Sequence, residues 1–228
     1  GIYDDHNASA ALSIDGEIVC AVQEERFTKR KNEKGFPKNC VKYIMKKYDL
    51  SNENIDIVAM STIVRDDLNN LNYPIDAVFE IDDYIDMMED YWKPKLAGLD
   101  YPKDYAKQIF EKKFKGEKSF YTIPDEFYNL NAEEIQSKVT DVIVNDISNF
   151  MQIDKEKIKF YDHHTCHAMY GYFANPNKKD KTIAITVDAY GDGKNQTVWK
   201  IENNKFELVA DSNQCEIARL YRMVTLYL

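Results

Sequence analysis

The sequence predicts an α/β fold, and three stretches near its start carry that prediction. Residues 8–14 and 17–23 are two apolar runs joined by an Asp-Gly pair, which favours a two-residue hairpin turn. Residues 36–48 place apolar side chains at helical spacing, with a proline near the start, and this indicates an amphipathic helix. Residues 55–62 are a short apolar run typical of a buried strand. With a short strand at residues 1–3, this order of elements predicts an RNase H-like lobe.

The middle of the chain interrupts this regular pattern. Residues 65–131 are rich in Tyr, Phe, Asp and Lys and contain four of the six prolines. Residues 102–115 within them have helical spacing, and we interpret the whole stretch as a large, mostly helical insertion. Packing over the parent core is the favoured role for such an aromatic-rich segment, and substrate recognition is the alternative.

The regular pattern of predicted helices and strands resumes after the insertion. Residues 132–151 predict a helix, with Asn131 as its N-cap and Glu134 in the capping-box position. Further strands are expected at residues 158–161, 182–188, 196–201 and 206–210, with turns at 191–193 and 203–204. We therefore divide the chain into a first lobe over residues 1–178 and the beginning of a second lobe over residues 179–228.

Composition excludes several classes of protein. The net charge of −9, with no strongly basic stripe, argues against nucleic-acid binding. A mean hydropathy of −0.57, without a long uncharged apolar run, excludes a transmembrane helix. The four cysteines lack CxxC spacing and predict buried thiols of a reducing compartment. Since no signal peptide is visible, we expect a cytoplasmic protein with no membrane partner.

Two remaining features concern the surface and the chain ends. The basic run at residues 26–34 is expected to be a solvated loop. The chain starts without Met and stops inside an apolar helical pattern at residues 226–228, so we expect it to be part of a longer polypeptide.

The histidines are the most informative residues for chemistry. Three of the four fall within five positions, and His163 and His167 are four apart, so on a helix they share one face. Two imidazoles on one helical face can chelate a divalent metal. Polar residues at a helix N-terminus are the alternative reading. Asp188, at the end of the predicted strand 182–188, would complete a His-His-Asp metal site.

Two polar turns, at residues 4–9 and 188–193, follow predicted strands and precede hairpins. Backbone N–H groups in glycine-bearing turns can contact phosphate closely. The alternative for the second turn is an ordinary hairpin turn that binds no ligand. The repeated arrangement suggests a fold of two lobes, each contributing one phosphate loop.

Several sequence blocks occur together in one order. They are residues 1–12, 22–31 and 35–37, the run His163-His164-Thr165-Cys166-His167-Ala168, residues 188–193, residues 218–221, and Val224-Thr225. Together they resemble the N-terminal domain of O-carbamoyltransferases of nodulation-factor and antibiotic biosynthesis. One position departs from the family pattern, because Ala189 stands where a glycine is expected.

The resemblance implies an actin/heat-shock-ATPase-like domain built of two RNase H-like lobes. It also implies a C-terminal YrdC-like domain of the same polypeptide, which makes carbamoyl-adenylate from carbamoyl phosphate and ATP. The N-terminal domain would then pass the carbamoyl group to a hydroxyl of a small-molecule or sugar acceptor in secondary-metabolite biosynthesis. The chain alone is expected to be inactive in forming carbamoyl-adenylate.

The resemblance also implies roles for individual residues. His6 would act as the base, or orienting group, toward the acceptor hydroxyl, a role suited to imidazole. His163, His167 and Asp188 would hold Fe²⁺, with Mg²⁺ as the alternative, against the nucleotide phosphate, and a further Asp ligand would follow residue 228. Nucleotide or phosphate contacts are expected from Asn7, Ser9, His164, Gly191, Asp192 and Gly193. The alternative for His164 is a place beside the metal ligands, without binding the metal itself. The segment Glu24-Glu25-Arg26 either shapes the site or forms a surface ion-pair cluster, and Cys166 is expected to face the core.

Three rival functions remain. A tRNA threonylcarbamoyl-adenosine-type transferase shares the fold, but the acidic charge speaks against a nucleic-acid acceptor. An actin-like ATPase or sugar kinase needs a catalytic carboxylate with Mg²⁺ in place of a histidine pair. The third rival is a metal-binding or partner-binding domain that is not an enzyme.

Overall fold

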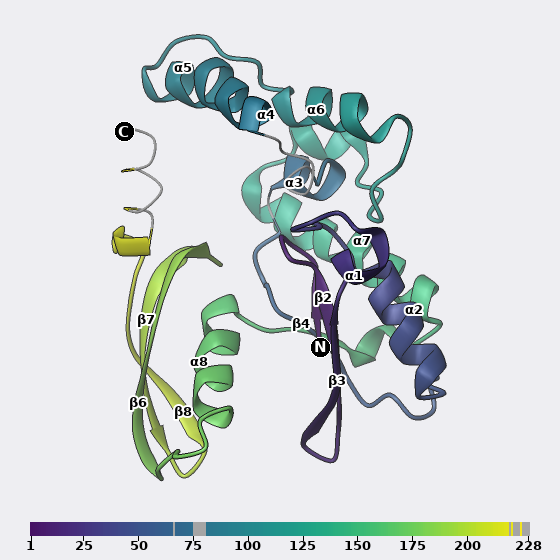
Figure 1. Ribbon diagram of the computed structural model, residues 1–228, viewed down its shortest axis with the longest axis vertical. Coiled ribbons are helices and arrows are strands. Elements are labelled where there is room, and N and C mark those ends of the chain that lie inside the picture. Colours follow the sequence, from purple (N-terminus) through teal and green to yellow (C-terminus); the bar gives the residue numbers. More distant parts are fainter. Residues whose placement is uncertain (66, 75–80, 219, 221–223, 225–228) are drawn as a thin grey trace. The chain divides into compact units, whose positions relative to one another are not determined.

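The computed structural model describes residues 1–65, 67–74, 81–218, 220 and 224, which form two compact units (Figure 1). Unit 1 comprises residues 1–60 and 65–159, and unit 2 comprises residues 61–64 and 160–228. This division differs from the boundary expected at residue 178, because the helix that carries the histidine cluster packs on the strands that follow it. Whether the units are lobes of the actin-like superfold stays a prediction.

Unit 1 is built around a five-stranded sheet with the strand order β3-β2-β1-β4-β5. Its strands are β1 (Ile2–Tyr3), β2 (Ser9–Ile14), β3 (Glu17–Gln23), β4 (Val58–Met60) and β5 (Ile158–Phe160). Strand β1 pairs antiparallel with β2 and parallel with β4, so the sheet is mixed. The hairpin turn has φ of 50° at Asp15 and 84° at Gly16, the left-handed values that a two-residue turn requires. The predicted α/β class and hairpin are therefore confirmed.

Two helices supply much of the core of unit 1. The first, α2 (Lys38–Lys47), buries Cys40, Val41 and Ile44. The second, α7 (Ala132–Met151), buries residues four apart along one face, namely Val139, Ile143, Ile147 and Met151. Full burial of each isoleucine side chain contributes roughly 1.5–3 kcal/mol. The capping box between Asn131 and Glu134 is present as predicted. Short helical turns α1 (Glu25–Thr28) and η4 (Lys155–Lys157) complete this part.

The insertion is mostly helical, as predicted. It contains α3 (Leu68–Asn72), α4 (Ile81–Asp86), η2 (Met87–Trp92), α5 (Lys93–Leu96), α6 (Tyr105–Phe114) and η3 (Asp125–Asn129). Its aromatic residues pack on the parent core, since Phe120 stacks on Phe36 at a centroid distance of 4.0 Å and Tyr121 is buried. The insertion therefore contributes to the core, the role favoured by the sequence.

Unit 2 combines one helix with a three-stranded antiparallel sheet, ordered β6-β7-β8. The helix is α8 (His163–Phe173), and the strands are β6 (Lys181–Gly191), β7 (Lys194–Glu202) and β8 (Lys205–Ser212). Ala168 and Tyr172 of α8 pack against Trp199 and Ile201 of β7. Both predicted turns are present, with positive φ at residues 192–193 and 203–204. Arg219, Tyr221 and Thr225 of the family block, and residues 226–228, lie outside the described residues.

Two composition-based expectations can be compared with the structure. In the described ranges, no helix combines the length and apolar character needed to cross a membrane. The four cysteines are free thiols, but only Cys40 is buried, while Cys20, Cys166 and Cys215 are partly exposed. The expectation of buried thiols is therefore correct for one of the four.

Candidate functional site

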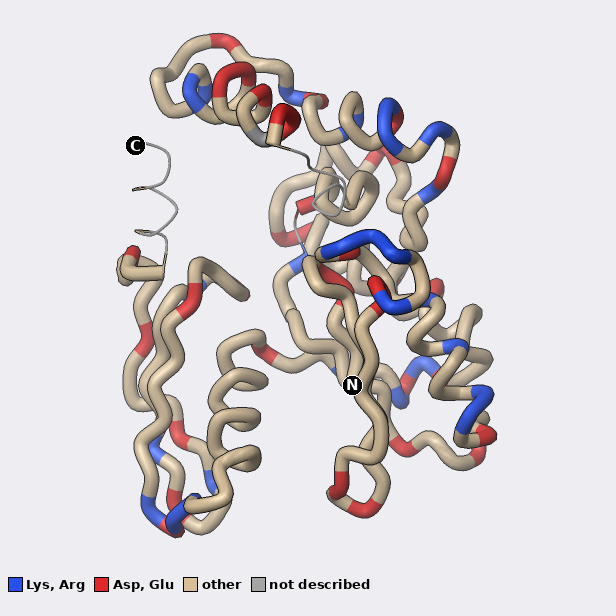
Figure 2. The backbone as a smooth tube through the Cα atoms, in the orientation of Figure 1, with Lys and Arg blue, Asp and Glu red and all other residues tan. Residues whose placement is uncertain are grey.

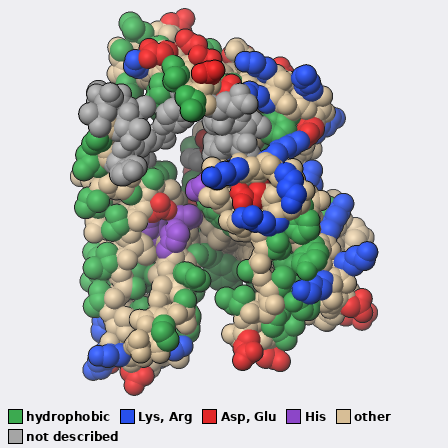
Figure 3. All heavy atoms as spheres, viewed as in Figure 1, with side chains coloured by type: hydrophobic (Ala, Val, Ile, Leu, Met, Phe, Trp, Pro, Cys, Tyr) green, Lys and Arg blue, Asp and Glu red, His purple; other side chains and the backbone are tan. Residues whose placement is uncertain are grey.

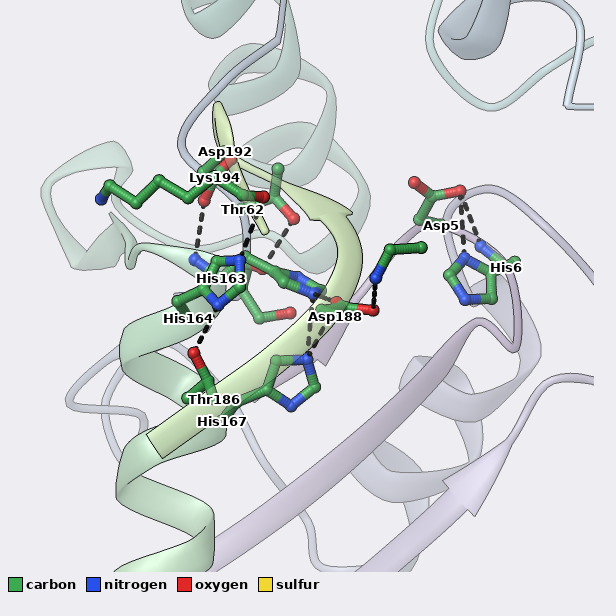
Figure 4. A network of polar contacts seen from close by, with 12 residues as sticks. Asp5, His6, Thr62, His163, His164, His167, Thr186, Asp188, Asp192 and Lys194 are labelled. Carbon is green, nitrogen blue, oxygen red and sulfur yellow. Dashed lines mark hydrogen bonds and ion pairs between the residues drawn. The ribbon is translucent and has the colours of Figure 1, made fainter. Parts of the chain in front are cut away.

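The structure brings together His163, His167 and Asp188, which come from the start of α8 and from β6 (Figure 4). His163 Nε2 lies 2.8 Å from Asp188 Oδ2 and 3.0 Å from His167 Nε2. His167 Nε2 lies 3.5 Å from the same Asp188 oxygen. Three side chains separated by up to 25 positions in sequence thus direct their ligand atoms to one point.

These residues fit a divalent transition metal. Ligand bonds from His nitrogen or carboxylate oxygen are about 2.0–2.2 Å long, so two atoms on one ion can lie up to about 4.2 Å apart. All three separations are shorter than that. Two imidazole nitrogens with one carboxylate oxygen form a donor set that suits Fe²⁺. Their role as ligands stays a prediction, to which we return below.

The charges of Asp188 and His163 are linked. The hydrogen bonds from His163 and then His167 hold the pKa of Asp188 well below its usual range, despite partial burial. The same bond to Asp188 raises the pKa of His163. Asp188 is therefore a carboxylate at neutral pH, as a metal ligand must be.

Gly191 is required by close approach of the His163 ring. A Cβ atom at position 191 would lie 2.2 Å from Cδ2 and 2.6 Å from Cγ of His163. The pairing of β6 with β7 shifts register between Val187 and Gly191, the stretch that contains Asp188. Such irregularities re-aim side chains, so this one helps to direct the carboxylate toward α8. The predicted phosphate role of Gly191 is thus joined by a steric one.

Replacing Gly191 with alanine should displace the His163 imidazole and weaken metal binding by roughly 10–100-fold, the effect typical of losing support for a ligand. Competition between the protein and a chelating dye for Zn²⁺ or Co²⁺ measures this. Gly171→Ala is the matched control, because Gly171 lies in α8 with nothing within 4 Å of an added Cβ. Equal metal affinity in the two variants would contradict the steric role of Gly191.

Asp192 organises the surroundings of the triad. Its carboxylate accepts hydrogen bonds from the backbone N–H groups of His163 (2.7 Å), Ile63 (3.1 Å) and Val64 (2.9 Å). It thereby fixes the first residue of α8 and joins residues 61–64 to the rest of unit 2. Because its oxygens accept hydrogen bonds from three backbone amides, Asp192 has a supporting role in unit 2, and its phosphate contact stays a prediction. The phosphate role of Gly193 stays a prediction.

Asp162 caps α8. Its Oδ1 accepts from the Thr165 N–H at 2.8 Å, and its Oδ2 accepts from Lys194 Nζ at 3.1 Å. Although burial raises the pKa of Asp162, these hydrogen bonds outweigh it and lower the pKa overall. An Asp immediately before a helix is a common N-cap signal, so this residue could have been found from sequence.

His164 is fully buried and belongs to a hydrogen-bond chain. Its Nε2 donates to the Lys194 carbonyl at 3.2 Å, because a carbonyl can only accept. Its Nδ1 must then accept from the Thr186 hydroxyl at 2.6 Å. Thr186 accepts in turn from Thr197 (2.6 Å), and Thr197 accepts from the Trp199 indole N–H (2.7 Å). Burial lowers the pKa of His164, so the ring is neutral.

These hydrogen bonds leave His164 without the phosphate contact that was expected of it. Both ring nitrogens are engaged inside unit 2, and the side chain has no exposed surface. Burial also raises the pKa of the neighbouring Cys166 thiol to about 11, so it is protonated at neutral pH and poorly suited to be a ligand. The partners of His164 carry no motif that sequence analysis could use.

In unit 1, His6 lies in the loop between β1 and β2, and its side chain is 57 % exposed. Its Nδ1 is 3.2 Å from the Tyr3 hydroxyl and 3.8 Å from Asp5 Oδ1. The same Asp5 oxygen accepts from the His6 backbone N–H at 2.7 Å and pairs with Lys34 Nζ at 3.1 Å. Burial raises the pKa of Asp5, but His6 and Lys34 outweigh it and hold that pKa far below its usual range. The imidazole is therefore positioned by a carboxylate and open to solvent.

The other predicted contact residues of unit 1 lie on the same segment as His6. Asn7 adopts a left-handed backbone conformation with φ of 59°, which Asn tolerates better than most residues. Ser9 begins β2 and pairs with Tyr3 on one side and Gln23 on the other. Their phosphate contacts stay predictions.

Glu24, expected either to shape the site or to belong to a surface ion-pair cluster, caps a helix. Its buried carboxylate accepts from the Asn39 N–H (3.0 Å), the Asn39 side-chain amide (2.7 Å) and the Cys40 N–H (2.9 Å), all in the first turn of α2. Glu25 pairs with Arg26 at 2.7 Å, which is the surface ion pair given as the alternative.

A buried ion pair that sequence analysis missed supports the loop of His6. Asp4 accepts two hydrogen bonds from Arg65 Nη1, at 3.0 and 2.9 Å, and one from the Tyr121 hydroxyl at 2.6 Å. Burial raises the pKa of Tyr121 well above its usual value, so it stays a donor. The residue that follows β1 is thereby joined to Arg65 at the start of the insertion and to Tyr121 in its later part.

Comparison with known proteins places the chain in a family. A stretch of 65 residues, 28 % of the chain, is 43 % identical to an uncharacterized protein of Methanocaldococcus jannaschii, of which it covers 12 %. An uncharacterized protein of Synechocystis sp. is 24 % identical over 88 % of the chain and 26 % of its own length. A second uncharacterized protein of M. jannaschii is 28 % identical over 58 % of the chain and 22 % of its own length. The chain thus spans about a quarter or less of these curated relatives. The sequence model of the carbamoyltransferase N-terminus matches residues 1–228, and the chain therefore belongs to that family.

Proposed function

We propose that this chain is the N-terminal part of an O-carbamoyltransferase, which moves a carbamoyl group from carbamoyl-adenylate to a hydroxyl of a small-molecule or sugar acceptor. The observation that carries the proposal is the convergence of His163, His167 and Asp188 within 3.5 Å of one another, in a chain of this family. We infer further that unit 1 is an RNase H-like lobe and unit 2 the beginning of a second one. The mixed sheet of unit 1 supports this inference.

On the leaving-group side, the triad of unit 2 would hold Fe²⁺. When bound, such a cation neutralises negative charge on the phosphate of the nucleotide that leaves. Asp188 contributes its carboxylate, and Asp192 and Gly191 keep His163 in place. A further Asp, expected beyond residue 228, would add a ligand to this set.

On the acceptor side, His6 would remove the proton from the acceptor hydroxyl. That oxygen then forms a bond to the carbamoyl carbon, the bond from that carbon to the phosphate oxygen breaks, and AMP leaves with the electron pair. An ordinary imidazole titrates at a pKa of about 6.5 and can accept the proton near neutral pH. The exposure of His6 and the adjacent Asp5 carboxylate support this role.

The proposal assigns carbamoyl-adenylate formation, from carbamoyl phosphate and ATP, to a C-terminal YrdC-like domain of the same polypeptide. A tRNA acceptor is disfavoured by the net charge of −9. A kinase or ATPase of the actin-like class is disfavoured because such sites need a catalytic carboxylate with Mg²⁺, and the candidate site here contains a histidine pair.

The test is to incubate the complete polypeptide with carbamoyl phosphate, ATP and a panel of sugars and aminoglycosides. Mass spectrometry should detect acceptors that have exchanged one hydroxyl hydrogen for a carbamoyl group. Removing divalent metal with a chelator should stop the transfer, and Fe²⁺ should restore it. Transfer at an unchanged rate in the chelated protein would contradict the role of the triad. Turnover of ATP without any need for carbamoyl phosphate would favour the ATPase alternative.

A further inference from the structure

A cavity of about 280 Å³ lies within unit 1, between residues 24–39 and residues 110–120 of the insertion. Its volume is just below the usual range for small-molecule sites, roughly 300–1,000 Å³. Four phenylalanines and four basic residues line it: Phe36, Phe110, Phe114, Phe120, Arg30, Lys34, Lys38 and Lys118. Figure 2 shows Lys and Arg residues gathered along the segment between β3 and α2, and Figure 3 shows Lys and Arg side chains surrounding a few acidic ones on the face in view.

The aromatic residues form flat walls. Phe36 stacks on Phe120 at a centroid distance of 4.0 Å, and Phe110 stacks on Phe114 at 4.6 Å. Arg30 lies over the Phe114 ring at 4.7 Å, so the basic run contacts the insertion at this residue. Arg26, Lys29 and Lys31 of the run are exposed, as expected for a solvated loop. Paired phenylalanines held this way present a rigid apolar surface to a ring or hydrocarbon body.

The acidic residues of the cavity are already engaged. Glu24 caps α2, and Glu117 accepts two hydrogen bonds from Arg30, at 2.6 and 3.0 Å. Glu33 accepts from the Thr28 hydroxyl at 2.8 Å and lies 3.7 Å from Arg30. These carboxylates are therefore unavailable to a cationic ligand.

Two cations of the cavity are not neutralised in this way. Lys38 and Lys118 make no ion pair within 4.0 Å with any carboxylate among the described residues. Lys38 acts on Glu117 only at longer range, where it helps to lower the pKa of that carboxyl after the stronger effect of Arg30. The cavity thus combines aromatic walls with two ammonium groups suited to an anion.

The cavity also connects to the predicted base. Lys34, which lines it, pairs with Asp5 Oδ1 at 3.1 Å, and that oxygen lies 3.8 Å from His6 Nδ1. One carboxylate therefore separates the wall of the cavity from the imidazole. We propose that this cavity binds the acceptor, and that the acceptor is a small molecule carrying an anionic group beside a ring or apolar body. The identification of this ligand as the acceptor rests on the proposed function. Its anionic and apolar character is inferred from the cavity alone.

Binding of phenyl phosphate, measured by calorimetry on the complete polypeptide, tests the proposal. Phenyl phosphate supplies both a ring and an anion, and it should bind more tightly than either phenol or inorganic phosphate. The double variant Lys38→Ala/Lys118→Ala should weaken that binding about tenfold or more, because charge-assisted hydrogen bonds to phosphate are lost. The matched control Lys103→Ala/Lys112→Ala removes two exposed lysines of the insertion that do not line the cavity.

A further variant separates the cavity from the metal triad. Phenyl phosphate should bind equally well when His163 and His167 are both alanine. Equal affinity in the Lys38→Ala/Lys118→Ala variant and its control would overturn the proposal, as would loss of binding in the histidine variant.

Different results would contradict the proposed function and the proposed cavity ligand. If phenyl phosphate binds as expected and no hydroxyl compound is carbamoylated, the ligand chemistry of the cavity is supported and the proposed function is contradicted. If carbamoyl transfer occurs and the Lys38→Ala/Lys118→Ala variant leaves the acceptor KM unchanged, the function stands and the cavity proposal falls.

Discussion

The variant His163→Ala/His167→Ala should lose metal affinity by more than about 100-fold, because it keeps only one of three ligands and a single carboxylate binds such ions weakly. Asp188 would remain, without the two imidazoles that lie 2.8 and 3.5 Å from its Oδ2. Elemental analysis of the purified protein, followed by competition with a chelating dye, measures the loss.

The double change should leave α8 intact. Asp192 bonds to the backbone N–H of residue 163, and Asp162 bonds to the backbone N–H of Thr165, so both contacts survive when the imidazoles are removed. Circular dichroism should therefore be unchanged. His6→Ala serves as the control, because it also removes an imidazole but not one of the triad. Retention of both metal and nucleotide binding in the double variant would refute the metal and phosphate roles together.

The second large effect is expected from His6→Ala. Carbamoyl transfer to the acceptor should fall by roughly 10²–10⁴-fold, the usual contribution of a general base. Formation of carbamoyl-adenylate should continue, because the proposal assigns that step to another domain. Pyrophosphate release measures the first step, and mass spectrometry of the acceptor measures the second.

The comparison of these two readouts isolates the role of His6. Its side chain is 57 % exposed and does not belong to the buried core, so its loss should not unfold unit 1. His6→Gln keeps a hydrogen-bonding group without a base and should be nearly as slow as His6→Ala. Transfer at the original rate in either variant would remove His6 from its assigned role.

Much of the fold could be predicted because its signals are local. The Asp-Gly hairpin, the capping box of α7 and the turns at residues 192–193 and 203–204 depend on residues within a few positions of one another. The pair His163 and His167 is local as well, since helical spacing alone places both on one face. Asp188 could be anticipated because it follows a β-branched run.

Residues with structural roles were harder to recognise. The sequence did not show that Glu24 caps the helix that contains Asn39, 15 positions further along the chain. Asp192 and His164 looked like phosphate contacts, yet their polar atoms bond to the backbone and to buried hydroxyls of unit 2. A carboxylate or an imidazole serves chemistry and packing equally well, so its residue type does not tell which partner it meets.

By itself, the sequence determined the α/β class, the family, and the candidate triad of His163, His167 and Asp188. Tertiary structure alone decided why Gly191 must be small, how Asp4 joins Arg65 and Tyr121, and that a basic aromatic cavity adjoins the loop of His6. The physical reason is the separation in sequence between the residues that interact. Periodicity and caps are set by neighbours in the chain, whereas steric exclusion, burial and charge pairing depend on residues that meet only after folding.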